Sequence, residues 1–211
     1  MSRLAPGPSG RAAARLFTYS HGRRQLDAQE ALWLRDATPF ELDCDGRTLA
    51  AWSWGDGPTV LLHHGWGGRG AQLGAFAAPL VAAGFSVVTY DAPAHGASPG
   101  RFTNGVEFAR TIAEASRQLH GLHAVVAHSL GCLATAYALR RPLPIDRLVF
   151  VAPPAGMSTH ARQFAGAAGF PDPAPGLMLA PFQTKLRMDW VHFPPDRLAA
   201  TARPARRRRA P

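Results

Sequence analysis

The feature that most constrains this chain is a regular alternation of short apolar runs and amphipathic segments between residues 59 and 152. The apolar runs show no polar alternation, which is typical of strands that are buried on both faces. Such strands form a parallel sheet between two helical layers, joined by right-handed crossovers. The expected strands are 59–63, 85–90, 123–127 and 147–152, and the expected helices are 71–83, 105–119 and 130–140.

A β-hairpin is expected before this region. Two strand-like runs, 39–44 and 47–54, are separated by Asp45-Gly46, and an Asp-Gly pair between such runs is a strong hairpin signal. A short helix over 27–36 precedes them. The sequence therefore predicts an α/β fold: a mostly parallel open sheet with an antiparallel N-terminal hairpin.

The chain divides into four regions by composition. Residues 1–25 are rich in Arg, Ala, Gly and Pro and are expected to form a loose basic arm. Residues 26–155 form the predicted core. Residues 156–198 hold many Gly, Pro, Met and Phe residues and are expected to be a lid-like, partly helical region. Residues 199–211 form an Ala/Arg/Pro tail, with no further strand signal before it.

Composition excludes several classes of protein. With 211 residues, 46% of them hydrophobic, the chain is long enough for one domain with a buried core. No run of about 18 apolar residues is present, so no membrane span is expected. The N-terminus lacks the apolar stretch of a secretory signal, which favours a cytoplasmic location. The two cysteines, Cys44 and Cys132, are expected to be small core residues rather than a disulfide framework.

The formal net charge of +9 suggests nucleic acid at first sight. However, Arg203 and Arg206–Arg209 supply five of these charges within the tail. The other basic residues are scattered and are not interleaved with aromatic residues on one face. We therefore expect an exposed charged tail and no nucleic-acid partner, with a basic-tailed binding module as the weaker alternative.

The strongest local motif is Ala127-His128-Ser129-Leu130-Gly131, placed between a predicted strand and a predicted helix. A sharp strand-to-helix turn forces the serine into a strained conformation and exposes its hydroxyl. The residues two before and two after must be small, as Ala127 and Gly131 are. The motif resembles the Gly-x-Ser-x-Gly nucleophile elbow of α/β-hydrolases, with Ala in place of the first Gly. The alternative is a serine that only caps the helix.

The segment His63-His64-Gly65-Trp66-Gly67-Gly68 directly follows the first parallel strand. It resembles the oxyanion loop of the same family. That resemblance implies that the backbone N–H groups of Trp66 and Leu130 form an oxyanion hole. A phosphate-binding loop is the alternative, but neither the dinucleotide nor the Walker spacing is present. We expect the two histidines to brace the loop, because no ligand partner lies at a metal-binding spacing.

A third motif, Asp91-Ala92-Pro93-Ala94-His95-Gly96-Ala97-Ser98, follows the next strand. It resembles the Asp-x-x-x-His-Gly-x-Ser turn of α/β-hydrolases, where it is mainly structural. Asp91, His95 and Ser98 are therefore not proposed as a catalytic triad, although their types would suit one. The three motifs occur in the family's order, and the resemblance covers residues 37–155 closely and 156–198 loosely.

The resemblance also implies an acid and a histidine after Ser129, each following a further strand. No such strand is found, so we expect a C-terminally truncated or frameshifted member of the family. His160 and His192 are the histidines that follow Ser129, and substitution by either is the alternative. The acids near them are Asp172, Asp189 and Asp196.

The leading hypothesis is thus a serine hydrolase that acts on an ester, thioester or amide by acyl transfer. Ser129 is its expected nucleophile, and Trp66 and Leu130 are the expected oxyanion-hole residues. No cofactor and no metal are expected, and the partner is a small acyl substrate. The alternative is a non-catalytic or weakly active remnant of the fold. The hydrophobic strand at 147–152 is expected at a sheet edge, where it offers a surface for self-association.

Overall fold

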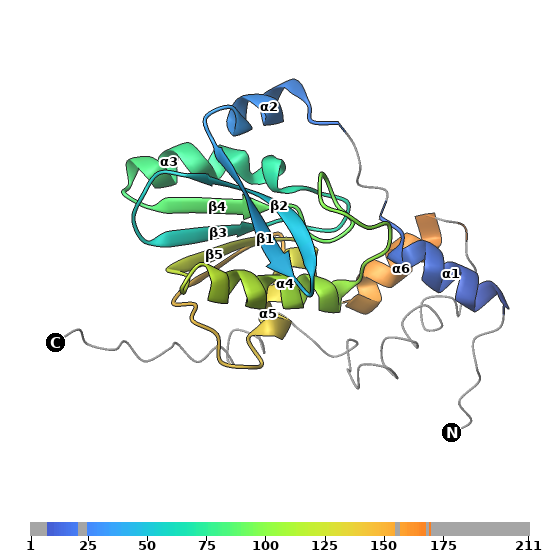
Figure 1. The fold of residues 1–211 in the computed structure, drawn as a ribbon. Helices are drawn as coiled ribbons and strands as arrows, with labels where there is room; N and C mark the ends of the chain where they lie inside the picture. The colour runs from blue at the N-terminus through green and yellow to red at the C-terminus, as the bar shows by residue number, and fades with distance from the viewer. Residues whose placement is uncertain (1–7, 21–24, 155–156, 168, 170–211) are drawn as a thin grey trace.

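The computed structural model of the chain describes residues 8–20, 25–154, 157–167 and 169 (Figure 1). Within them, a mixed sheet has the strand order β1-β2-β4-β3-β5-β6. The pairs β1/β2 and β2/β4 are antiparallel, whereas β3/β4, β3/β5 and β5/β6 are parallel. The strands are β1 (Thr38–Cys44), β2 (Arg47–Trp54), β3 (Thr59–His63), β4 (Ser86–Tyr90), β5 (Ala124–His128) and β6 (Leu148–Val151). This confirms the predicted α/β sheet with its antiparallel hairpin.

The hairpin turn has the predicted geometry. Asp45 and Gly46 both have positive φ, at 52° and 72°, as a two-residue type I′ connection requires. The register pairs Cys44 with Arg47, directly across the turn. The Asp-Gly pair is therefore sufficient to set where the first two strands meet.

Helices cover both faces of the sheet (Figure 1). The elements are α1 (Pro8–Thr18), α2 (Ala28–Leu34), the 3-10 helix η1 (Gly70–Phe76), α3 (Ala77–Ala82), α4 (Gly105–Gln118), α5 (Leu130–Ala138) and α6 (Met157–Ala167). Neighbouring strand residues point to opposite helical layers: Leu61 packs in a cluster with Phe108 of α4, whereas Leu62 packs with Leu73 of η1. The continuous apolar runs follow from this, because both faces of each central strand are buried.

Two sequence-based expectations need correction. The loose arm over 1–25 contains α1, because Ala and Arg favour helix and Pro8 occupies a first-turn position where proline is accepted. The expected helix over 71–83 is a 3-10 helix that continues into the short α3. The interior glycine Gly74 lies against Trp33, where an added Cβ would come within 2.5 Å of the tryptophan Cβ.

The C-terminal expectations are tested only in part. Helix α6 lies in the expected lid-like region, while 170–198 and the tail 199–211 lie outside the described residues. Within the described part no strand follows β6, which is an edge strand. Val149 on this edge is 49% exposed, which fits the predicted apolar edge.

Candidate functional site

Ser129 stands at the turn between β5 and α5, as the motif predicts. Its backbone has φ 51° and ψ −121°, a combination that residues with a side chain rarely adopt. The Ser129 N–H donates to the carbonyl of Val151 on the neighbouring strand at 3.0 Å, which fixes the turn to the sheet. Ser129 itself is half-buried, so its side chain is within reach of a ligand.

Gly131 explains why a small residue is needed after the serine. A Cβ built on Gly131 would lie 2.7 Å from the carbonyl oxygens of both His63 and His64. The first turn of α5 is therefore pressed against the backbone that leaves β3. On the other side of the turn, Ala127 is completely buried, and its methyl group is accommodated where the motif more often has glycine.

The loop that follows β3 lies directly beside the serine. A Cβ on Gly65 would come within 2.9 Å of the Ser129 Cβ, so only glycine allows this approach. Trp66 follows Gly65, and Leu130 follows Ser129, so the tertiary structure brings the two predicted oxyanion-hole residues to neighbouring backbones. Among the described residues, the N–H groups of Trp66 and Leu130 donate no hydrogen bond and remain available to an acceptor.

Two buried histidines hold this loop in place. His64 Nε2 accepts from the N–H of Ala92 at 2.9 Å, and its Nδ1–H donates to the carbonyl of Gly65 at 2.7 Å. His95 Nε2 likewise accepts from the N–H of Gly67 at 3.0 Å, and its Nδ1–H donates to the carbonyl of Pro93. The bracing role expected for His64 is confirmed, and His95 forms a second link between the same loop and the turn that follows β4.

Burial determines the charge of these rings. Removal from water, with a smaller contribution from a neighbouring histidine, lowers the pKa of His64 and of His95 to about 4. Both rings are therefore neutral near pH 7. Since each Nε2 already accepts a backbone hydrogen bond, neither ring has a free acceptor with which to take a proton from a serine.

His63, at the end of β3, forms a hydrogen bond through Nδ1 with the hydroxyl of Tyr90. Burial lowers the pKa of His63 well below its ordinary value and raises that of Tyr90 well above its own. The Nε2 atom of His63 has no partner among the described residues. The His63–Tyr90 pair is completely buried in the core and supports the start of the loop that follows β3.

The Asp91–Ser98 turn is structural, as predicted. The two carboxylate oxygens of Asp91 accept the N–H groups of Gly70 and Ala97, each at 2.7 Å. The Ser98 hydroxyl donates to the carbonyl of Asp91 and accepts the N–H of Ala50. All these polar groups are committed to the backbone, so they tie the β4 turn to η1 and to the hairpin.

Two supports of the site were missed from the sequence. Glu30 on α2 forms a buried ion pair at 2.6 Å with Arg69, the residue that directly follows the His63–Gly68 loop. The same carboxylate accepts the N–H of Asp27 in a capping box. The Asp-x-x-Glu spacing signalled the capping box, but no local pattern signals a partner 39 residues away.

The second missed support is Phe17 on α1. Its ring stacks on Trp66 with a centroid separation of 6.2 Å, and Phe108 of α4 stacks on Trp66 at 6.0 Å. The indole thus packs against two phenyl rings from helices that are far apart in the sequence, α1 and α4. Phe17 was assigned to the loose arm because the local composition carries no information about this contact.

Within the described residues no base is presented to Ser129. Its hydroxyl makes no hydrogen bond to any described group. His160 belongs to α6, but its side chain lies outside what the structure describes, as do His192 and the three late aspartates. The candidate site therefore consists of a strained serine and two free amides, without a visible proton acceptor.

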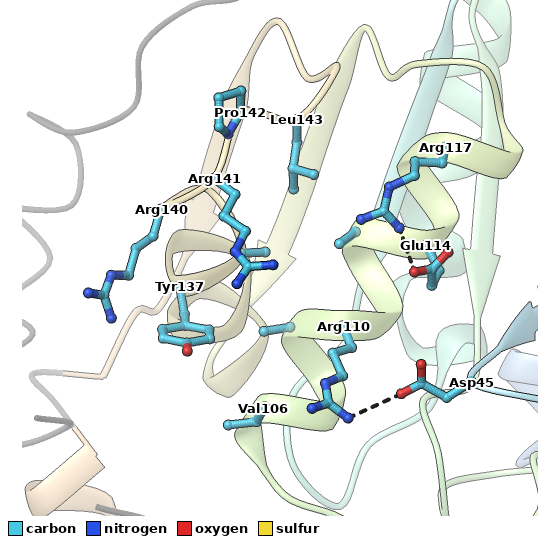
Figure 2. Close-up of a pocket in the computed structure, with 13 residues that line it drawn as sticks. Asp45, Val106, Arg110, Glu114, Arg117, Tyr137, Arg140, Arg141, Pro142 and Leu143 are labelled. Carbon is cyan, nitrogen blue, oxygen red and sulfur yellow. Dashed lines mark hydrogen bonds and ion pairs between the residues drawn. The ribbon is translucent and has the colours of Figure 1, made fainter. Parts of the chain in front are cut away.

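A surface depression lies between α4 and α5 (Figure 2). Its volume is 830 Å³, and Ser129 does not line it. Two of its basic groups are neutralised: Arg110 lies 3.3 Å from Asp45, and Arg117 is paired with Glu114. The arginines that line it are Arg110, Arg117, Arg140 and Arg141. These exposed ion pairs belong to an ordinary charged surface.

Comparison with known proteins decides the family. A family model described as the alpha/beta hydrolase fold matches residues 58–193, which includes β3, the oxyanion-type loop and the elbow. The chain belongs to the α/β-hydrolase family. A search of curated proteins gave no match.

Solved structures agree with this fold. An epoxide hydrolase from Vigna radiata aligns with a TM-score of 0.53 at 20% identity, over 57% of this α/β-hydrolase and 41% of that chain. Epoxide hydrolase A from Mycobacterium thermoresistibile gives 0.52 at 19%, over 63% and 45%. An esterase from Pyrococcus furiosus gives 0.59 at 21%, over 78% and 68%. This α/β-hydrolase thus spans less than half the length of the two epoxide hydrolases.

The helices of this α/β-hydrolase are short. The longest in the described part is α4, with 14 residues. None of the described helices has both the length and the apolar character needed to cross a membrane.

Proposed function

We propose that this α/β-hydrolase is a serine hydrolase that transfers the acyl group of an ester, thioester or amide to water through Ser129. One observation carries the proposal: the strained backbone of Ser129 lies against Gly65, beside two backbone amides that no described group occupies. Strain of this kind costs about 1–3 kcal/mol and persists mainly where it serves a site.

In the proposed reaction, the Ser129 Oγ attacks the acyl carbonyl carbon while its proton passes to a base. The carbonyl oxygen gains the electron pair of the π bond, and the N–H groups of Trp66 and Leu130 donate to that oxyanion. Loss of a single donor of this kind typically costs about 3–4 kcal/mol of transition-state stabilisation. The leaving alcohol, thiol or amine then departs with a proton, and water releases the acyl group from the serine.

The base of this reaction is not one of the two loop histidines. The buried rings of His64 and His95 are neutral and fully hydrogen-bonded, so they support the loop and take no proton. The second candidate function, a non-catalytic member of the family, is favoured by the unpartnered Ser129 hydroxyl. Such a protein would keep the binding surface and the amides but activate no nucleophile.

A fluorophosphonate probe separates the two candidates. The purified full chain is treated with the probe, and peptides are analysed for modification of Ser129. We expect labelling of the wild type and none of Ser129→Ala, with Ser53→Ala, a half-buried serine on β2, as the matched control that still labels. Hydrolysis of p-nitrophenyl esters and of an aryl epoxide is measured on the same samples.

The labelling and hydrolysis results together distinguish acyl transfer through Ser129 from the non-catalytic alternative. Ester hydrolysis that disappears in Ser129→Ala supports acyl transfer. A wild type that is folded by circular dichroism but shows neither labelling nor hydrolysis supports the non-catalytic alternative. Turnover of the epoxide without labelling of Ser129 would contradict the serine mechanism.

A further inference from the structure

The N-terminal helix α1 lies outside residues 58–193, the part that matches the family. It nevertheless lies beside α6, beyond the carboxyl ends of β3 and β4 (Figure 1), and the loop that follows β3 is part of the candidate site. Ligands of open α/β sheets bind at this carboxyl edge. The helix is therefore placed over the site rather than on a distant surface.

Phe17 is the residue through which α1 contacts the site. Its side chain is 7% exposed, stacks on Trp66 with an interplanar angle of 13°, and meets the edge of Phe164 at 5.2 Å. It also belongs to one apolar cluster with Leu130 and Leu133 from the first turns of α5. Phe17 thus packs in the same cluster as both proposed oxyanion-hole residues.

The helix is fixed in this position by backbone contacts. The Thr103 N–H donates to the carbonyl of Thr18 at 2.9 Å, and the Ser20 N–H donates to the carbonyl of Arg101 at 3.0 Å. These bonds form a short antiparallel bridge next to the end of α1. Because Thr18 immediately follows Phe17, the bridge holds the phenyl ring in place.

We propose that Phe17 is a specificity-determining residue of the Ser129 site, forming the wall that limits the length of an apolar acyl group. The inference rests on the proposed function. In the proposed complex, the acyl chain extends along the side chains of Trp66 and Leu130, whose amides hold its carbonyl oxygen. Both side chains pack in the Phe17 cluster, so a growing acyl chain meets the phenyl ring. The buried residues of the cluster are Phe17, Val106, Leu130, Leu133, Ala136, Ala161 and Ala165, all apolar.

The test compares short and long acyl groups in the full chain. The ratio of kcat/KM for p-nitrophenyl octanoate to that for p-nitrophenyl acetate is measured for the wild type, Phe17→Leu and Phe17→Ala. Each additional buried methylene is worth about fourfold in affinity, so we expect the ratio to rise by about tenfold or more in Phe17→Ala. Phe17→Leu is expected to lie between, and Leu16→Ala, at a 39% exposed position of the same helix, is expected to match the wild type.

A binding measurement keeps this test independent of catalysis. In the Ser129→Ala background, the dissociation constants of decanoate and butyrate are compared with and without Phe17→Ala. A selective gain for decanoate supports the proposal even if no variant turns over an ester, in which case only the proposed function fails. An equal loss for both chain lengths in both assays would show that Phe17 merely stabilises α1, and would overturn the proposal.

Discussion

Replacing Ser129 by glycine should stabilise this protein while abolishing its proposed chemistry. Ser129 has φ 51° and ψ −121°, which costs a residue with a Cβ about 1–3 kcal/mol. Glycine adopts this conformation freely but loses about 0.5–1 kcal/mol through the greater entropy of the unfolded chain. The net expectation is an increase of about 1 kcal/mol in the free energy of unfolding. For a chain of this size, that corresponds to a rise in Tm of roughly 2–4 °C.

Urea denaturation followed by circular dichroism measures this change, and calorimetry provides Tm. Ser129→Ala is the matched comparison, because it removes the hydroxyl but keeps the strained Cβ; its stability should stay within about 0.5 kcal/mol of the wild type. His120→Gly, at an exposed position with φ 57°, should also stabilise. Ser53→Gly, on β2, should destabilise by roughly 0.5–1 kcal/mol.

The difference in the free energy of unfolding between Ser129→Gly and Ser129→Ala tests whether the backbone at position 129 is strained. If the glycine variant is no more stable than the alanine variant, the strain is no larger than the roughly 0.5–1 kcal/mol that glycine loses through entropy. The backbone geometry would then be no argument for a functional serine. Fluorophosphonate labelling should be lost in both variants, which separates the stability effect from the chemistry.

Three further outcomes follow from the supports of the site. Gly131→Ala would place a methyl group 2.7 Å from two carbonyl oxygens, so urea denaturation should show a loss of more than about 2 kcal/mol. Glu30→Gln replaces the charged partner in the buried pair with Arg69 by a neutral one and should lower the free energy of unfolding by about 1.5–3 kcal/mol in the same assay. His64 and His95 have pKa values of about 4 when folded and near 6.5 when unfolded. The unfolded state therefore takes up protons first as the pH falls from 6.5 to 4, and stability should decrease by up to about 3 kcal/mol per ring, measured by unfolding at several pH values.

Each of these has a control in the same chain. Gly166→Ala, where an added Cβ meets nothing within 4 Å in helix α6, should be neutral or stabilising. Asp36→Asn breaks an exposed pair with Arg35 and should leave the free energy of unfolding nearly unchanged. His95→Gln should weaken the decrease in stability at acidic pH; an unchanged pH dependence would contradict the assignment to the buried rings.

Much of the candidate site was predictable because its signals are local. The strand before Ser129, the helix after it and the small residue at 131 are all encoded within ten residues. The same is true of the Asp45-Gly46 turn, whose backbone requirement is met by those two residue types. Such features depend on steric limits of the backbone, and these limits act over a few residues regardless of the rest of the chain.

The sequence by itself determined the order of strands and helices along the chain, the position of the strained serine and the glycines that let the loop after β3 approach it. Only the tertiary structure decided that Phe17 covers that loop, that Glu30 neutralises Arg69 and that the histidines accept backbone hydrogen bonds. The physical reason is separation along the chain. A stack between residues 17 and 66, or an ion pair between 30 and 69, depends on how the elements pack, and the surroundings of either partner in the sequence do not record it.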